Sequence, residues 1–136
     1  MNIFDELRKL NMLLIDDDEW VRDSLQMFFE SEGCKITALE TAEEGLGLIR
    51  RQYFDIIIVD FRLPGMDGIE FINRLPKRQA NSLKILITAY GDKDVLSRVK
   101  KAGIQEFIAK PFTSEVIEAS IGRLINTPEH RLAHFS

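Results

Sequence analysis

Cysteine is nearly absent from this chain of 136 residues, because Cys34 is the only one. A single cysteine excludes an internal disulfide framework and fits a reducing compartment. Long apolar runs are also missing, since none approaches the ~20 residues that a membrane-spanning helix needs. Residues 1–10 mix apolar with charged side chains and so lack the apolar region of a secretory signal. We therefore expect a cytoplasmic protein with no membrane attachment.

The third absence is an excess of positive charge. The chain has 18 Lys and Arg against 22 Asp and Glu, which gives a formal net charge of −4. Nucleic-acid-binding domains usually carry a basic stripe, so this balance argues against direct nucleic-acid binding within the chain. The sequence also shows no internal repeat, low-complexity tract or interdomain linker. Its length favours a single domain with one core.

Residues 55–65 are the segment around which the rest of the chain is organised. Four consecutive β-branched residues, at positions 56–59, are followed by Asp60 and then by the turn signal Pro64-Gly65. An unbroken apolar run of this kind indicates a strand buried on both faces, in the middle of a parallel sheet. Asp60 then lies at the carboxyl end of a central strand, the edge where open α/β sheets bind ligands.

Short apolar runs alternate with helical patterns along the whole chain, which predicts an α/β fold with a mostly parallel sheet and right-handed connections. Its core should be one domain, residues 11–126, between an N-terminal extension (1–10) and a C-terminal tail (127–136). The extension fits either a docked amphipathic helix or a frayed arm. Helical spacing places Leu96 and Val116 on inward faces of the last two helices. The expected strands are residues 12–15, 35–39, 56–60, 84–88 and 106–109.

Polar side chains follow four of these strands, and the carboxyl ends of parallel strands meet at one edge of a sheet. Neighbouring carboxylates cannot all stay ionised without a cation between them, and Mg²⁺ held by carboxylates is the ordinary solution beside phosphate. A lysine and a hydroxyl complete a set suited to placing a phosphoryl group on a carboxylate. Individually, the same residues have structural interpretations: helix capping by the acidic loop and strand termination by the others. The set consists of Asp16, Asp17, Asp18, Asp60, Thr88 and Lys110.

Four segments carry a resemblance to a known family. They are residues 14–18 (LIDDD), 58–68 (IVDFRLPGMDG), 87–89 (ITA) and 110–112 (KPF). In order and spacing they resemble the receiver domain of two-component response regulators, over roughly residues 11–126. The resemblance implies a flavodoxin-like, doubly wound (βα)5 fold with a five-stranded parallel sheet in the order 2-1-3-4-5.

The resemblance also implies roles for individual residues. Asp60 would be the phosphoacceptor. Asp16, Asp17 and Asp60 would bind Mg²⁺ together with the backbone carbonyl of Arg62, and Asp16 would do so directly or through water. Lys110 would pair with the phosphoryl group or with the acceptor carboxylate.

Two further features follow from the same resemblance. Thr88 would bind the phosphoryl oxygens and Phe107 would be the aromatic partner of the switch. The peptide bond between Lys110 and Pro111 would be cis.

As a receiver, the chain would be a phospho-switch that catalyses only its own phosphorylation and dephosphorylation, rather than a conventional enzyme. The phosphoryl group would come from a histidine kinase or a phosphotransfer protein. The output surface would comprise the helix at 92–101, the strand at 106–109 and the helix from 114, and would bind a target protein or form a homodimer. The chain would be a stand-alone receiver, a phosphorelay intermediate, or the receiver part of a longer transcriptional regulator.

Two other functions compete with this interpretation. A small-molecule phosphohydrolase would use the same aspartyl phosphate, but Arg62 stands where the common Asp-x-Asp motif has its second aspartate. A flavin-binding module of the same fold would need an uncharged phosphate cradle after the first strand, where this chain is acidic. Turnover of phosphate esters and a yellow colour would distinguish them.

Overall fold

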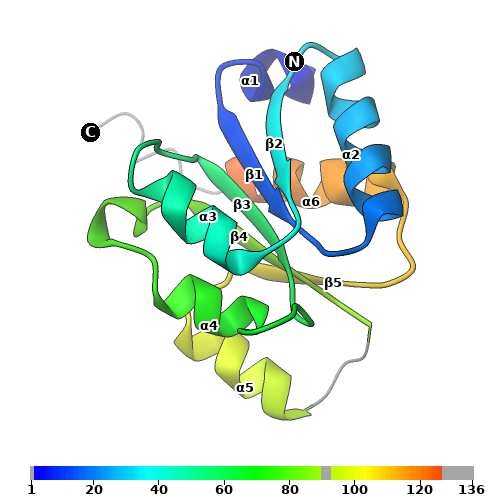
Figure 1. Ribbon diagram of the computed structural model, residues 1–136. Helices are drawn as coiled ribbons and strands as arrows, with labels where there is room; N and C mark the ends of the chain where they lie inside the picture. Colours follow the sequence, from blue (N-terminus) through cyan, green and yellow to red (C-terminus); the bar gives the residue numbers. More distant parts are fainter. Residues whose placement is uncertain (1, 90–92, 127–136) are drawn as a thin grey trace.

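The computed structural model describes residues 2–89 and 93–126 and has a parallel sheet at its centre (Figure 1). The strands are ordered β2-β1-β3-β4-β5, and every neighbouring pair is parallel. The fold class and strand order expected from the resemblance are confirmed. The strands are β1 (Asn11–Ile15), β2 (Lys35–Leu39), β3 (Ile56–Asp60), β4 (Leu83–Thr88) and β5 (Glu106–Ala109).

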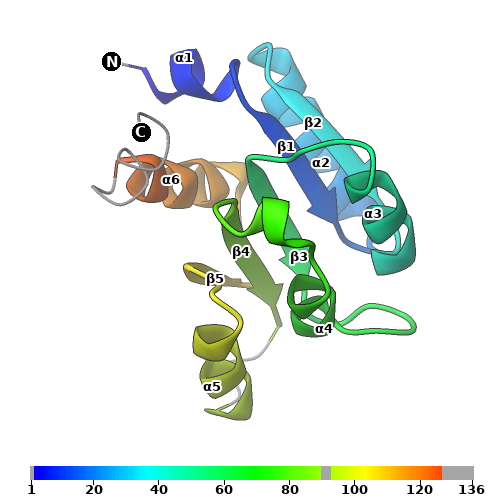
Figure 2. The ribbon, with the colours of Figure 1, turned by 90° about the vertical axis from the view of Figure 1, so that its left-hand side faces the viewer.

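Helices cover both faces of the sheet (Figures 1 and 2). On one face lie α1 (Ile3–Leu7), α2 (Glu19–Ser31) and α6 (Ser114–Ile125). On the other lie α3 (Ala42–Ile49), α4 (Gly68–Asn73) and α5 (Lys93–Lys101), and the short 3-10 helix η1 (Lys77–Gln79) precedes β4. Within the described residues, no helix is long and apolar enough to cross a membrane.

The strands alternate between the two hydrophobic cores that these layers enclose. In β1, Met12 and Leu14 face the layer of α2 and α6, whereas Leu13 and Ile15 face the layer of α3, α4 and α5. All five residues of β3 are buried, as a central strand requires. Asp60 is therefore held by a strand that is packed on both sides.

Four of the helices begin at a capping side chain just beyond the carboxyl edge of the sheet. Asp18 caps α2, Asp67 caps α4 and Thr113 caps α6 through their side-chain oxygens. Thr41 and Glu44 form a reciprocal capping box at α3. These caps satisfy amide groups that would otherwise lack partners, and they fix where these four loops end.

The N-terminal extension is docked, which decides between the two interpretations that the sequence allowed. Phe4 and Leu7 of α1 are buried in the core under α2, and the Phe4 ring lies 6.0 Å from that of Phe28. Arg8 then donates a hydrogen bond to the Glu32 carbonyl at 2.6 Å. The tail, residues 127–136, lies outside the described residues.

Two inward positions expected from helical spacing are wrong. Leu96 of α5 is 40% exposed and Val116 of α6 is 43% exposed. In each helix, residues spaced by four supply the buried stripe, namely Val95 with Val99 and Ile117 with Ile121. The neighbouring apolar residue falls at the border of that stripe and contributes to the surface instead.

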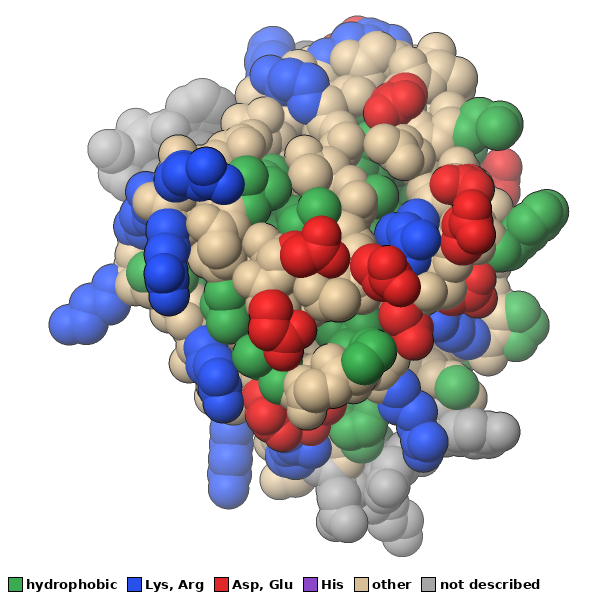
Figure 3. Space-filling view, in the orientation of Figure 1, with side chains coloured by type: hydrophobic (Ala, Val, Ile, Leu, Met, Phe, Trp, Pro, Cys, Tyr) green, Lys and Arg blue, Asp and Glu red, His purple; other side chains and the backbone are tan. Residues whose placement is uncertain are grey.

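Surface charge is unevenly distributed. Figure 3 shows Asp and Glu side chains gathered in the middle of one face and Lys and Arg side chains mainly along its margins. The net charge of −4 therefore combines regions of the surface that are locally acidic with regions that are locally basic.

Candidate functional site

The carboxyl ends of four strands bring the predicted polar residues to one edge of the sheet. Asp16 directly follows β1, and its amide donates to the Leu39 carbonyl. Asp60 and Thr88 are the last residues of β3 and β4. Lys110 follows β5, and its amide donates to the Thr88 carbonyl at 2.8 Å. Backbone pairing thus fixes all four positions relative to one another.

Three carboxylates form a cluster at this edge. Carboxylate oxygens of Asp16, Asp17 and Asp60 lie within 4.8 Å of one another. Asp16 is completely buried and Asp60 is 5% exposed, whereas Asp17 is open to solvent. Asp18 lies outside the cluster, because its side chain caps α2 by accepting from the Trp20 amide. The structural interpretation of the acidic loop therefore applies to Asp18, and the other two aspartates face Asp60.

The two buried carboxylates are held in an environment that disfavours their charge. Burial, followed by the neighbouring Asp16 charge, raises the pKa of Asp60 to about 6. Burial also raises the pKa of Asp16. Asp16 Oδ1 accepts a hydrogen bond from the Asp18 amide at 2.9 Å, but Oδ2 has no hydrogen-bond partner among the described residues. A buried oxygen in this state is a suitable ligand for a cation.

Lys110 provides the positive charge of the site. Its Nζ lies 3.1 Å from Asp16 Oδ2, an ion pair without hydrogen-bond geometry, and 3.5 Å from Asp60 Oδ1. Burial acts to lower the pKa of Lys110, but the two aspartates outweigh it and raise the pKa above its ordinary value. One ammonium thus pairs with two of the three carboxylates of the cluster, so it does not balance their combined negative charge. The Lys110–Pro111 peptide bond is cis.

The remaining predicted residues differ in how far they are buried. Thr88 is buried at the end of β4. Arg62 is exposed in the loop two residues beyond Asp60. Phe107, on β5, is 42% exposed, so its ring belongs to the surface and not to the core.

Gly68 is a functional position that the sequence reasoning missed. A Cβ at this residue would lie 2.4 Å from the Asp60 carbonyl oxygen, so only glycine lets α4 begin this close to β3. The glycine itself is visible in the sequence as part of the turn after β3. What the sequence does not show is that the backbone of β3 approaches it.

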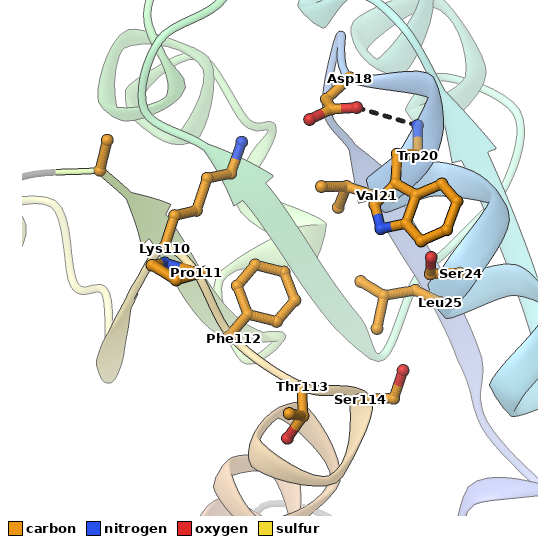
Figure 4. Close-up of a pocket in the computed structure, with 11 residues that line it drawn as sticks. Asp18, Trp20, Val21, Ser24, Leu25, Lys110, Pro111, Phe112, Thr113 and Ser114 are labelled. Carbon is orange, nitrogen blue, oxygen red and sulfur yellow. Dashed lines mark hydrogen bonds between the residues drawn. The ribbon is translucent and has the colours of Figure 1, made fainter.

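An open cavity of about 630 Å³ lies beside the cluster, between the start of α2 and the loop that joins β5 to α6 (Figure 4). Trp20, Val21 and Leu25 line it from α2, and Lys110 and Phe112 line it from the loop. Lys110 therefore lines the cavity and also pairs with carboxylates of the acidic cluster. Trp20 is 79% exposed, so it forms an outer wall and does not pack inward.

Residues 12–122 match the family described as the response regulator receiver domain. The chain belongs to this family. The match favours the receiver interpretation over the flavin-binding and small-molecule phosphohydrolase alternatives, and the buried aspartate cluster is consistent with the phosphoacceptor site of a two-component receiver.

Relatives and solved structures agree with this assignment. The transcriptional regulatory protein FixJ of Bradyrhizobium diazoefficiens is 31% identical over 121 residues, which cover 89% of this chain and 59% of FixJ. Sporulation initiation phosphotransferase F of Bacillus subtilis is 29% identical over 84% of this chain and 92% of that protein. A CheY-like receiver from Methanospirillum hungatei has a TM-score of 0.83 at 27% identity and covers 91% of this chain and 98% of that one. The chain spans less than two thirds of the length of FixJ.

Proposed function

We propose that this receiver accepts a phosphoryl group on Asp60 from a histidine kinase or a phosphotransfer protein, and that the modification switches a protein-binding surface. The observation that carries the proposal is the position of Asp60, at the end of a fully buried strand, within reach of both Lys110 and the Asp16–Asp17 pair. Among the described residues, no second group of three acidic side chains lies close enough together to share a metal ion.

The transfer itself is a displacement at phosphorus. An Asp60 carboxylate oxygen forms the new P–O bond, the P–N bond to the donor imidazole breaks, and the leaving nitrogen keeps the electron pair. Lys110 stabilises the negative charge of the phosphoryl oxygens from its position beside Asp60. The product is an acyl phosphate, which the same site then hydrolyses slowly. In this role the chain turns over no separate substrate, so it is not a conventional enzyme.

The residues at this site fit a Mg²⁺ ion. Three carboxylates converge there, two of them are buried, and one oxygen of Asp16 has no hydrogen-bond donor among the described groups. Asp16, Asp17, Asp60 and the Arg62 carbonyl would hold the ion, in keeping with its preference for oxygen ligands. When bound, Mg²⁺ would neutralise the crowded carboxylates and the incoming phosphoryl oxygens.

The donor would approach through the cavity beside the cluster. The cavity is open, is lined by both apolar and polar groups of α2 and of the β5–α6 loop, and includes Lys110 (Figure 4). Trp20 stands at its outer wall and offers a large exposed aromatic surface to a partner.

The output would be read on the surface formed by α5, β5 and α6. Thr88 would bind the new phosphoryl oxygens, and Phe107 would turn inward beside it. Three exposed apolar side chains support this choice, because Leu96, Phe107 and Val116 come from these three elements. The same surface would serve a separate target protein, the next member of a phosphorelay, an attached domain of a longer regulator, or a second copy of this receiver. We place the protein in the cytoplasm.

The test is the intact mass of the protein after incubation with a small acyl phosphate donor and Mg²⁺. The native protein and the control Asp23→Asn, which changes an exposed aspartate of α2, should each gain one phosphoryl group that hydroxylamine removes. Asp60→Asn should gain none. A phosphoryl adduct on Asp60→Asn, or no adduct on the native protein, would overturn the proposal.

A further inference from the structure

Arg98 of α5 contacts both ends of the loop that follows the acceptor strand. Its Nη2 lies 2.9 Å from Asp67 Oδ2, at the end of the loop. Its guanidinium carbon lies 5.6 Å from the centroid of the Phe61 ring, at the beginning of the loop, which is a cation–π distance. No other side chain among the described residues is recorded with contacts to both of these positions.

Each of the two ends that Arg98 contacts also makes other hydrogen bonds, which connect the loop to β4 and to α4. Asp67 Oδ1 accepts from the Glu70 amide and so caps α4. The Phe61 amide donates to the Ile87 carbonyl at 2.7 Å, and its carbonyl accepts from the Gly68 amide at 2.9 Å. A planar guanidinium suits this arrangement, because it can bind a carboxylate and lie over a ring at the same time.

The position of this loop matters for the acceptor site. Phe61 is the next residue after Asp60, and the loop also contains Arg62, whose carbonyl we assigned to Mg²⁺. A carbonyl ligand has no side chain with which to adjust, so the path of the loop alone decides where its oxygen lies.

We propose that Arg98 is a positioning residue: by holding Phe61 and Asp67 from α5, it places the loop that supplies the Arg62 carbonyl to the ion and couples that loop to α5. The inference rests on the proposed function. Because coupling is reciprocal, an ion or phosphoryl group that fixes the loop also restrains α5. Arg98 would thus connect the acceptor site to the output surface.

The sign of one measurement distinguishes positioning from simple electrostatics. Removing a positive charge near a cation site should strengthen Mg²⁺ binding by Coulomb's law. If Arg98 positions the loop, Arg98→Gln should instead weaken it, by roughly two- to tenfold, the range that a partly exposed ion pair and a cation–π contact supply. Arg98→Lys keeps the charge but not the planar fork, so its loss of affinity should be smaller.

The experiment is calorimetric titration of the full chain with Mg²⁺ alone, together with thermal unfolding of each variant. Arg123→Gln is the matched control, because Arg123 forms a comparable surface ion pair with Glu106, at 2.6 Å, on β5 and α6. Asp67→Asn keeps an N-cap oxygen but loses the charge that holds Arg98. In that background Arg98→Gln should change the Mg²⁺ affinity less than it does in the native protein.

The outcomes separate this inference from the proposed function. Weaker Mg²⁺ binding by Arg98→Gln, partial rescue by Arg98→Lys and an unchanged affinity in Arg123→Gln support the positioning role. Native-like or tighter binding by a folded Arg98→Gln variant overturns that role and leaves the proposed function intact. A native protein that binds no Mg²⁺ overturns both.

Discussion

The two edges of the central sheet bury polar side chains in opposite ways. At the amino edge, Gln79 and Ser82 are completely buried, and both bind the backbone of Phe54. Gln79 Oε1 accepts from the Phe54 amide, and the Phe54 carbonyl accepts from Gln79 Nε2 and from Ser82 Oγ. Lys84, which is also buried, donates to the carbonyls of Ala80 and Ser82. These side chains satisfy peptide groups that would otherwise be buried without partners.

The carboxyl edge buries Asp16 and Asp60 with much less compensation. Asp16 Oδ2 has no hydrogen bond among the described residues, and burial raises the pKa of both carboxyl groups. Lys110 pairs with each of them but cannot neutralise both. The Gln79 and Ser82 hydrogen bonds at the amino edge therefore stabilise the fold, whereas the crowded carboxyl groups at the other edge oppose folding, an arrangement consistent with the phosphoacceptor site of a receiver.

The largest expected effect on stability is at the amino edge. Gln79→Ala removes three hydrogen bonds to buried groups and leaves a cavity, so we expect the free energy of unfolding to fall by about 3 kcal/mol. Denaturant titration measures this change. Gln52→Ala, at a half-buried position before β3, should change stability by less than about 1 kcal/mol. Equal effects of the two substitutions would show that the network contributes no special stability.

The next effect lies at the carboxyl edge and is a dependence of stability on pH. The pKa of Asp60 is raised from 3.8 to about 6 in the folded protein. The folded state therefore binds a proton more tightly than the unfolded state, and stability should fall as pH rises from 4 through 6. A pKa shift is worth about 1.4 kcal/mol per pKa unit, so the shift of Asp60 corresponds to a loss of stability of at most about 3 kcal/mol. We expect a loss of about 2 kcal/mol.

Asp60→Asn provides the corresponding comparison. It cannot ionise, so at pH 7 without Mg²⁺ it should be more stable than the native protein by about 2 kcal/mol, and most of that advantage should vanish near pH 4. Asp23→Asn is the control for a mutated aspartate outside the cluster. An Asp60→Asn variant that is less stable than the native protein at pH 7 would contradict the assigned electrostatics.

The sequence predicted the carboxyl edge better than the amino edge, for a physical reason. Asp60 follows an unbroken apolar run, so both its strand and its place at the end of that strand were apparent. Gln79 and Ser82 lie in a polar segment that resembles an ordinary surface loop. Their burial depends on the backbone of Phe54, which is 25 residues away from Gln79, and no local pattern reports such a contact.

Local periodicity was similarly limited for the helices. It identified which face of α5 and α6 is buried, but not how wide that face is, because the width depends on the neighbouring elements. Leu96 and Val116 were misplaced for this reason. Arg98 was missed because its partners, Phe61 and Asp67, precede it by more than 30 residues. The described structure thus adds mainly the contacts that cross between elements.

A third, smaller effect on stability is stabilisation by Mg²⁺. An ion that binds only the folded state should raise the free energy of unfolding by about 1.4 kcal/mol at a concentration ten times its dissociation constant. Asp16→Asn replaces a buried residue that we propose as a ligand and should lose most of this gain, whereas Asp23→Asn should keep it. Chelation should reverse the gain in the native protein. Equal stabilisation of Asp16→Asn and the native protein would place the ion elsewhere.

The smallest expected effect on stability, below about 0.5 kcal/mol, is that of Trp20→Ala, because a side chain that is 79% exposed loses little buried area. Because Trp20 lines the cavity, its substitution tests whether a phosphodonor approaches the carboxyl edge through that cavity, although it should hardly change the stability of the protein.

Phosphorylation of Trp20→Ala by a small acyl phosphate should stay native-like, since Asp60, Lys110 and the acidic cluster are untouched. Transfer from a phosphorylated histidine-containing partner should slow by roughly tenfold if the indole is a main contact. Met27→Ala is the matched control, because Met27 is a second exposed apolar residue of α2, 74% exposed, that does not line the cavity. Equal slowing with both donors would mean that Trp20 supports the acceptor chemistry, and no slowing with either would move the donor's approach away from this cavity.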